Sequence, residues 1–278
     1  MSTPTARRVV LGLLLAKDGA PLAVRYAIAA CALFGITENN VRVTLARLSA
    51  EGLIEASGRG AYVIGHAGAR LNAAVSEWRR AEERVRPWEG RYVMVHTGPL
   101  PRGDRRVVQR RERALALYGL RELERGLFVR PDNLAGGAAA LRQRLVAVGL
   151  EPDAAVFDAG GFDDVREARI TALWDGAALT AAYHAEHERL TTWLAHGAEF
   201  EPEVAARECY LLGGAAIRQV VFDPWLPEPL VDTVARARFV ATVKTFDQAG
   251  KAIWEAFGEG HARMPVPTVR GELRPRTH

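Results

Sequence analysis

The residues best suited to bind a partner lie close together, in one short polar segment near the N-terminus. Arginine can donate two hydrogen bonds to guanine, asparagine can pair in the same way with adenine, and threonine can bond a base or a phosphate. We therefore interpret this segment as a surface that binds DNA. Its candidate residues are Thr37, Asn39, Asn40, Arg42, Val43, Thr44 and Arg47.

The order of these residues along the segment separates two expected roles. A helix that enters the major groove reads bases mainly with its N-terminal residues. We expect Asn39, Asn40, Val43 and Thr44 to face the DNA. Arg42 and Arg47 are expected nearer the phosphates.

The segment itself is predicted to be a helix over residues 38–50. Val41, Leu45 and Leu48 recur at i, i+4 and i+7, which gives one apolar stripe along a helix. Thr37 suits the N-cap, because its hydroxyl can accept a hydrogen bond from a free amide of the first turn. The apolar stripe must face a core, so the polar side is expected to face outward.

Two helices, expected near residues 9–15 and 22–34, precede this one. Two short strands, 53–56 and 61–64, follow it and are joined by a tight turn, Ser57-Gly58-Arg59-Gly60. Three helices and a hairpin are the layout of a winged helix-turn-helix. Arg59 at the tip of the wing is a candidate to enter a minor groove or meet a phosphate; the alternative is a solvated turn.

The rest of the chain predicts an α+β protein with two further domains. Strand and helix patterns after residue 88 follow the order βαββαβ, which is that of a ferredoxin-like domain, and a C-terminal α-helical domain comes next. The expected boundaries are 1–66 for the winged helix-turn-helix, 67–87 for a polar, solvated connector helix, 88–165 for the ferredoxin-like dimerisation domain, 166–260 for the helical domain and 261–278 for a flexible tail. In the helical domain, separate helices are expected near 176–195, 202–221, 230–246 and 248–257.

Bulk composition fits such a protein. The chain has 278 residues, of which 49% are hydrophobic and 25% charged, as in ordinary globular proteins. No apolar stretch is long enough to span a membrane. Cys31 and Cys209 form neither a disulfide framework nor a zinc motif; Cys31 is expected to be buried and Cys209 partly exposed. We therefore expect a cytoplasmic protein.

A second basic region, residues 102–113, is rich in arginine. The whole chain has a formal net charge of only +4. Contact with nucleic acid therefore requires positive charge to be concentrated on one face, as it is in this region. The cluster is a candidate to contact a DNA backbone or an acidic ligand. A solvated helix face, neutralised in part by Asp104 and Glu112, is the favoured alternative.

Enzymatic readings find little support in the sequence. Ferredoxin-like domains also occur in metal-dependent CRISPR-associated nucleases, which need an acidic residue at the end of the first strand; here that strand ends His96-Thr97. His184 and Glu188 are four residues apart but lack the order and the third ligand of a zinc site. No catalytic residues, metal ligands or cofactor are assigned.

Several segments together resemble the PaaX family of bacterial transcriptional regulators. The resembling segments are residues 37–48, Glu51-Gly52-Leu53-Ile54, Pro87-Trp88-Glu89-Gly90-Arg91-Tyr92 and Asp223-Pro224-Trp225-Leu226-Pro227. The resemblance implies a homodimeric repressor of a catabolic operon that binds double-stranded operator DNA and is released by a small-molecule effector such as an acyl-coenzyme A. A winged-helix module that binds protein instead of DNA is the remaining alternative, against which the outward arginine and asparagine side chains argue.

Overall fold

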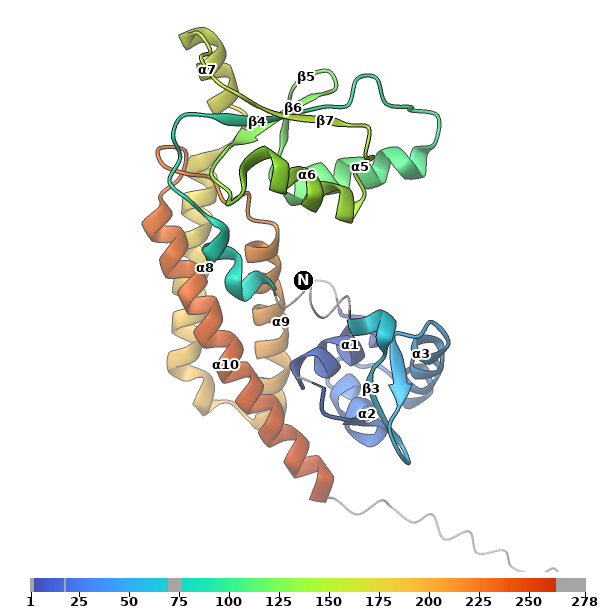
Figure 1. Cartoon of the computed structure of the whole chain (residues 1–278). Coiled ribbons are helices and arrows are strands. Elements are labelled where there is room, and N and C mark those ends of the chain that lie inside the picture. The colour runs from blue at the N-terminus through green and yellow to red at the C-terminus, as the bar shows by residue number, and fades with distance from the viewer. Residues whose placement is uncertain (1–2, 18, 70–76, 264–278) are drawn as a thin grey trace, which may run out of the picture. The chain divides into compact units, whose positions relative to one another are not determined.

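The computed structural model describes residues 3–17, 19–69 and 77–263 (Figure 1). It mixes helices with two antiparallel sheets, which confirms the prediction of an α+β protein. The chain forms two compact units. The first unit comprises the described residues of Met1–Arg70, Glu201–Arg207 and Lys251–His278, and the second comprises those of Leu71–Phe200 and Glu208–Gly250.

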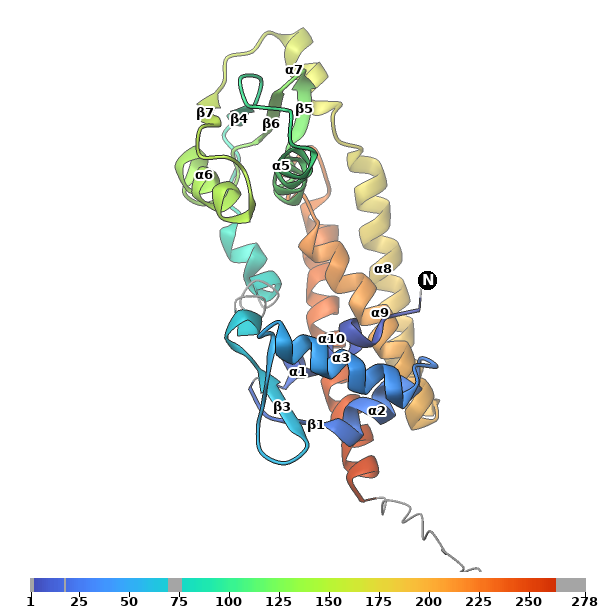
Figure 2. The ribbon, with the colours of Figure 1, turned by 90° about the vertical axis from the view of Figure 1, so that its right-hand side faces the viewer.

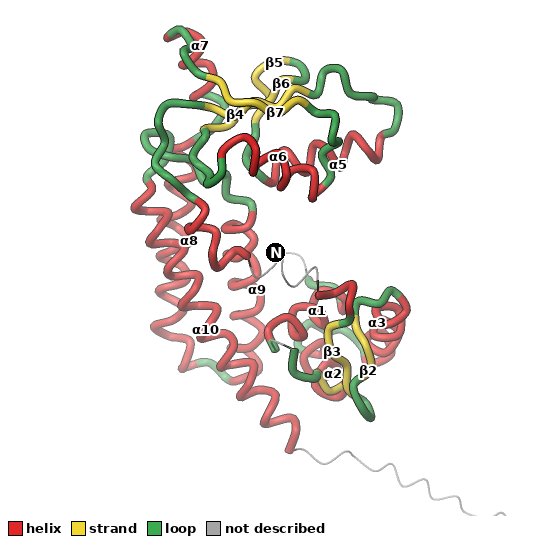
Figure 3. The backbone as a smooth tube through the Cα atoms, viewed as in Figure 1, coloured by secondary structure: helices red, strands yellow, loops and turns green. Residues whose placement is uncertain are grey.

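The N-terminal segment of the first unit forms helices α1, α2 and α3 and a small sheet (Figure 3). The strands lie in the order β1-β3-β2 and all pairs are antiparallel. The element bounds are α1 (Ala6–Ala16), β1 (Leu22–Ala23), α2 (Val24–Ala32), α3 (Glu38–Ala50), β2 (Ile54–Ala56) and β3 (Ala61–Ile64).

The prediction that the second helix begins at Leu22 was wrong. Leu22 pairs with Tyr62, and Ala23 pairs with Ala61, so these two residues form a third strand. The amide of Val24 donates to the carbonyl of Gly60 at 2.9 Å. The backbone of residues 22–24 therefore forms hydrogen bonds with the hairpin. As a result, α2 starts two residues later than its apolar pattern indicates.

The second unit begins with a 3-10 helix and a four-stranded sheet. The strand order is β5-β6-β4-β7, and every neighbouring pair is antiparallel. Helices α5 and α6 lie on the same side of this sheet (Figures 1 and 2). The bounds are η1 (Glu77–Arg84), β4 (Tyr92–His96), α5 (Arg105–Leu117), β5 (Arg121–Glu124), β6 (Leu127–Pro131), α6 (Gly137–Val148) and β7 (Ala155–Ala159).

The connector that the sequence predicted as one solvated helix is described only in part. Residues 70–76 lie outside the described residues, and η1 is a 3-10 helix. Trp78 within it is buried, with 3% of its surface exposed. Arg79 and Glu82 form ion pairs with Asp247 and Lys244, at 2.7 Å and 2.6 Å. This helix is therefore packed within the second unit.

Helices α8, α9 and α10 form a bundle in which aromatic side chains meet (Figures 1 and 2). Tyr183 stacks on Phe239 with ring centroids 5.9 Å apart, and Trp193 lies 5.0 Å from Phe246. Among the helices that the structure describes, none could span a membrane. The bounds are α7 (Asp164–Thr171), α8 (Gly176–His196), η2 (Gly197–Glu199), α9 (Pro202–Val221) and α10 (Thr233–Arg263).

Three details of this part differ from the prediction. Helix α7, which Asp163 caps, was not expected. The two helices expected over 230–246 and 248–257 are one helix, which continues through Gly250. Cys209 is 4% exposed, so the expectation that it is partly exposed was wrong.

Candidate nucleic-acid interface

Helix α3 is held in place by its apolar stripe and its cap. Val41, Leu45 and Leu48 are at most 3% exposed and face α1 and α2. The Thr37 hydroxyl accepts a hydrogen bond from the Asn40 amide at 3.4 Å, as an N-cap does. An ion pair of 2.7 Å between Arg7 and Glu51 ties α1 to the end of α3. The opposite side of the helix is thereby fixed in orientation.

That opposite side is open to solvent. The exposed residues on it are Asn39, Asn40, Arg42, Val43, Ala46 and Arg47, and Thr44 is half-buried. Val43 has 41% of its surface exposed. The arrangement gives a polar face with one apolar side chain, of the kind that can contact base edges and a thymine methyl group.

Two internal contacts order part of this face. Both Nε and Nη2 of Arg42 donate to Glu38 Oε1, at 2.8 and 2.7 Å. The Thr44 hydroxyl donates to Asn40 Oδ1 at 3.4 Å. Arg47, by contrast, makes no side-chain hydrogen bond or ion pair within the part of the chain that the structure describes. Of the two arginines, Arg47 therefore has the less engaged guanidinium.

Arg59 stands at the tip of the β2–β3 hairpin. Gly58 and Gly60 on either side have φ values of +70° and +76°, a region that favours glycine. The Ser57 amide donates to the Ala61 carbonyl at 2.9 Å and closes the turn. The Arg59 side chain is exposed, and it too has no partner among the described residues.

The two places considered for metal binding, the end of β4 and the His184–Glu188 pair, lie on different elements. Thr97, at the end of β4, donates its hydroxyl to the Gly126 carbonyl at 3.2 Å and is buried. His184 and Glu188 are exposed on α8. Within the described ranges no three His, Cys, Asp or Glu side chains are grouped as ligands of a metal ion. A shallow depression of about 480 Å³ lies between the first turns of α8 and residues 229–232, and its lining is mostly apolar.

A second polar arrangement, unlike the first, is buried inside the second unit. The Arg130 side chain on β6 is 1% exposed, and it donates to the carbonyls of Tyr118 and Pro131 and to Asn133 Oδ1. A further hydrogen bond of 3.3 Å reaches the Pro224 carbonyl. Asn133 in turn donates to the Trp225 carbonyl at 2.6 Å. The sheet and the segment around Pro224 are thus joined through one guanidinium and one amide.

The carboxylate of Asp223 organises the other side of this segment. Its two oxygens accept from the Trp225 amide and the Tyr183 hydroxyl, each at 2.6 Å. Arg236 donates to the Leu226 carbonyl at 2.5 Å and lies over the Trp225 ring. Trp225 adopts a positive φ of 52°, which few non-glycine residues do. We call the side chains of Arg130, Asn133, Tyr183, Asp223 and Arg236 the buried network.

Burial changes the acidity of these groups. Desolvation is the largest cause in each case: it raises the pKa of the Asp223 carboxyl, raises that of the Tyr183 hydroxyl, and lowers the pKa of Arg130 to about 10. The Asp223 charge further raises the pKa of Tyr183. Burial disfavours the charged form of each group, so the hydrogen bonds must compensate.

Comparison with known proteins bears on this buried region. Residues 174–256 match the PaaX-like protein C-terminal domain. The chain carries a PaaX-like domain. The match confirms the resemblance to the PaaX family over these residues. No curated protein matches the chain.

The PaaX-like domain holds three members of the buried network, namely Tyr183, Asp223 and Arg236, whereas Arg130 and Asn133 come before it. A solved structure supports the fold over a longer stretch. The uncharacterized protein Rv0674 from Mycobacterium tuberculosis has a TM-score of 0.64 and 24% identity, with 91% of this chain and 98% of that chain covered. The PaaX-like domain is therefore part of a fold that extends well beyond its own limits.

Sequence reasoning found the segment around Asp223 but missed its partners. An arginine in the apolar strand sequence Leu127-Phe128-Val129-Arg130-Pro131 was the available signal, because a charged residue flanked by buried strand residues needs a partner. Which partner it has was not visible, since Pro224 lies 94 residues away.

Proposed function

We propose that the chain is a DNA-binding transcriptional regulator that uses α3 as its recognition helix. The observation that carries the proposal is the sidedness of α3: its apolar residues are packed, while asparagines and an unpartnered Arg47 face outward. Those residue types match the donors and acceptors of base edges and phosphates. The PaaX-like domain adds support for a regulator.

The order of elements in the first unit supports the interpretation as a winged helix-turn-helix. Helices α1, α2 and α3 are followed by the β2–β3 hairpin, and β1 completes the sheet. In this interpretation α3 enters a major groove and Arg59 on the wing contacts an adjacent phosphate or minor groove. Asn39 and Asn40, at the N-terminal end of α3, read bases.

For the second unit we propose a ferredoxin-like domain followed by a helical domain. The order β4-α5-β5-β6-α6-β7, with strands arranged β5-β6-β4-β7 and wholly antiparallel, supports this interpretation. As the family resemblance implies, the regulator is a homodimeric, cytoplasmic repressor whose operator is released by an effector of the acyl-coenzyme A type. A two-fold protein favours an inverted-repeat operator, with half-sites about 34–36 Å apart or a multiple of that distance.

Selection from random duplexes tests the proposal without knowledge of the operator. The full chain is incubated with a pool of random double-stranded DNA at low salt, bound molecules are amplified, and the affinity of the enriched sequence is measured by fluorescence anisotropy between 50 and 200 mM salt. We expect an enriched inverted repeat whose binding weakens steeply with salt, because phosphate contacts release counterions. Failure to enrich any sequence, together with no binding at low salt, would overturn the proposal.

The same measurement separates DNA binding from the protein-interaction alternative. A winged helix that binds protein gives no enriched duplex and no salt-dependent anisotropy change. A nuclease gives shortened duplex when magnesium or manganese is present, which an electrophoretic check of the recovered DNA reveals.

A further inference from the structure

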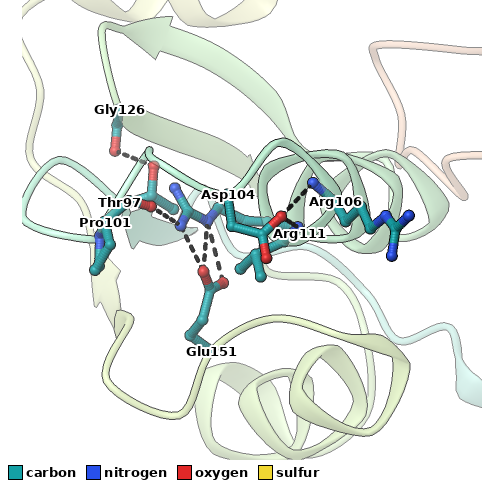
Figure 4. Close-up of polar contacts among 8 residues, drawn as sticks. Thr97, Pro101, Asp104, Arg106, Arg111, Gly126 and Glu151 are labelled. Carbon is teal, nitrogen blue, oxygen red and sulfur yellow. Dashed lines mark hydrogen bonds and ion pairs between the residues drawn. The ribbon is translucent and has the colours of Figure 1, made fainter.

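The arginines of α5 divide into one inward and several outward side chains. Arg111 is 3% exposed; it donates to both oxygens of Glu151 at distances from 2.5 to 3.2 Å and to the Pro101 carbonyl at 2.8 Å. Figure 4 shows Arg111 turned toward Glu151, whereas the guanidinium of Arg106 extends away from that pair. The cluster read from the sequence is therefore part structural and part surface.

The outward arginines form a row. Arg106, Arg110 and Arg113 are exposed and stand at i, i+4 and i+7, which places them on one side of the helix. None of the three side chains has an ion pair or hydrogen bond in the described part of the chain. We call these three residues the arginine row. Glu112 lies on a different side of the helix, so it does not neutralise them.

This placement destabilises the helix that carries it. Like charges at i and i+4 are unfavourable, and positive charge near a helix N-terminus opposes the helix dipole. The first turn of α5 holds Arg106 and no acidic residue. Other contacts offset these effects: Asp104 caps the helix by accepting from the Arg106 amide at 2.7 Å, and the Arg111–Glu151 pair fixes its inner face. Arg110 is also near enough to Glu151 to help lower the pKa of that carboxyl, which Arg111 holds. A row of exposed arginines on one side of a helix is suited to bind an anion.

We propose that the arginine row binds the phosphate backbone of double-stranded DNA, as a second contact surface besides α3. The inference rests on the proposed function. Residues i and i+7 of a helix are about 10 Å apart along its axis, and each DNA strand carries one phosphate per about 3.4 Å of helix axis. The row is therefore long enough to reach more than one phosphate of a strand.

A polyanion fits the row better than a small anionic ligand does. The three guanidinium groups are spread along one side of a helix, and the depression of about 480 Å³ in the same unit is lined by residues of α8 and 229–232, not by α5. The Arg110 side chain passes close to Gly149, where an added Cβ would lie 2.4 Å from its Cγ. The stem of Arg110 thus rests on the Gly149 backbone. A contact of the arginine row with phosphates would carry no base specificity.

The test compares two triple variants of the full chain. In the first, Arg106, Arg110 and Arg113 are each replaced by Gln. In the matched control, the exposed Arg121, Arg169 and Arg238 of the same unit are each replaced by Gln, which removes the same charge from scattered positions. Far-ultraviolet circular dichroism checks that both variants are folded, and anisotropy on the enriched duplex and on a scrambled duplex gives affinity against salt.

We expect the row variant to bind both duplexes about tenfold or more weakly at 0.15 M salt, with its salt slope reduced by about 2–3, because each lost phosphate contact removes about 0.9. The control should change affinity less than threefold. If the row variant matches the control while Arg47→Ala loses binding, the row proposal is overturned and the proposed function stands. If the wild-type chain binds no duplex, both are overturned; a row variant that loses binding to single-stranded RNA but not to duplex DNA also overturns the row proposal.

Discussion

Arginines play opposite parts in two regions of this molecule, the outer face of α3 and the buried network. Arg47 is exposed and has no partner within the described residues. Arg130 is fully enclosed and donates to four oxygens. A buried charge must be satisfied by its own protein because water cannot reach it, whereas an exposed charge is free to meet a partner. The comparison teaches that the number of internal partners separates a structural arginine from a candidate binding one.

The two regions should differ most in how much their arginines stabilise the fold. Arg130→Met removes the donor and leaves the carbonyls of Tyr118 and Pro224 and the Asn133 oxygen without it, so the free energy of unfolding should fall by about 3–5 kcal/mol. Urea denaturation followed by tryptophan fluorescence measures it.

Arg47→Met is the size-matched control for this change. It lies on the surface and should alter the free energy of unfolding by no more than about 0.5 kcal/mol. Similar losses in the two variants would show that the number of internal partners does not distinguish the two regions.

Affinity for DNA, by contrast, should depend on the exposed arginine of α3. Arg47→Ala removes a hydrogen bond from a charged donor, worth about 1.5–3 kcal/mol, and should therefore weaken binding to the enriched duplex about tenfold or more. Arg42→Ala is the internal control, because Arg42 is held by Glu38 and should matter less. Anisotropy titration measures both. Equal affinities of wild type and Arg47→Ala would contradict the assignment of α3 as the recognition helix.

Base preference gives a finer separation within the same face. Asn40→Ala should change which base is preferred at one position of each half-site, because an asparagine pairing with adenine discriminates by about 1–3 kcal/mol. Competition with single-base variants of the enriched duplex measures this. An unchanged preference at every position, with overall affinity reduced, would move Asn40 from reading bases to contacting the backbone.

The two regions also differ in how far the sequence could predict them. The bounds of α3 were predicted to the residue, because the Thr37 cap and the stripe of Val41, Leu45 and Leu48 are all local signals. The contacts of Arg130 could not be predicted, since its partners come from distant parts of the chain and periodicity carries no information about them. Local patterns fix elements; pairing across the fold decides which charges are enclosed.

The inner arginine of α5 illustrates the same limit. From the sequence, Arg111 is one of several equivalent arginines in a basic helix. Its structural role comes from its hydrogen bonds to Glu151, which lies forty residues later in the chain. The helical spacing alone places Arg106, Arg110 and Arg113 on one side of a helix. Which side of that helix faces solvent became known only from its buried residues, and with it the role of Glu112.

The smallest expected effect concerns the carboxylate of the buried network. Asp223→Asn keeps the size of the side chain and its bond from the Trp225 amide but places an amide against the Tyr183 hydroxyl, which should cost about 1 kcal/mol. Burial raises the pKa of Asp223 above its ordinary value. A group whose pKa is raised by folding adds stability at a pH below its unfolded pKa and loses that contribution as the pH rises through its folded pKa.

The stability advantage of wild type over Asp223→Asn should therefore be larger at pH 4 than at pH 7, as urea denaturation at the two pH values would show. Asp158→Asn provides the opposite case, because Arg91 lowers the pKa of the exposed Asp158 carboxyl; its contribution is present at neutral pH and is lost as the pH falls. A pH trend of the same sign in both variants would mean that hydrogen bonds from Tyr183 and the Trp225 amide, which lower the pKa of Asp223, outweigh its burial. In that case the buried Asp223 carboxylate would be as readily ionised as an exposed one. The two regions would then differ only in the number of their internal hydrogen-bond partners.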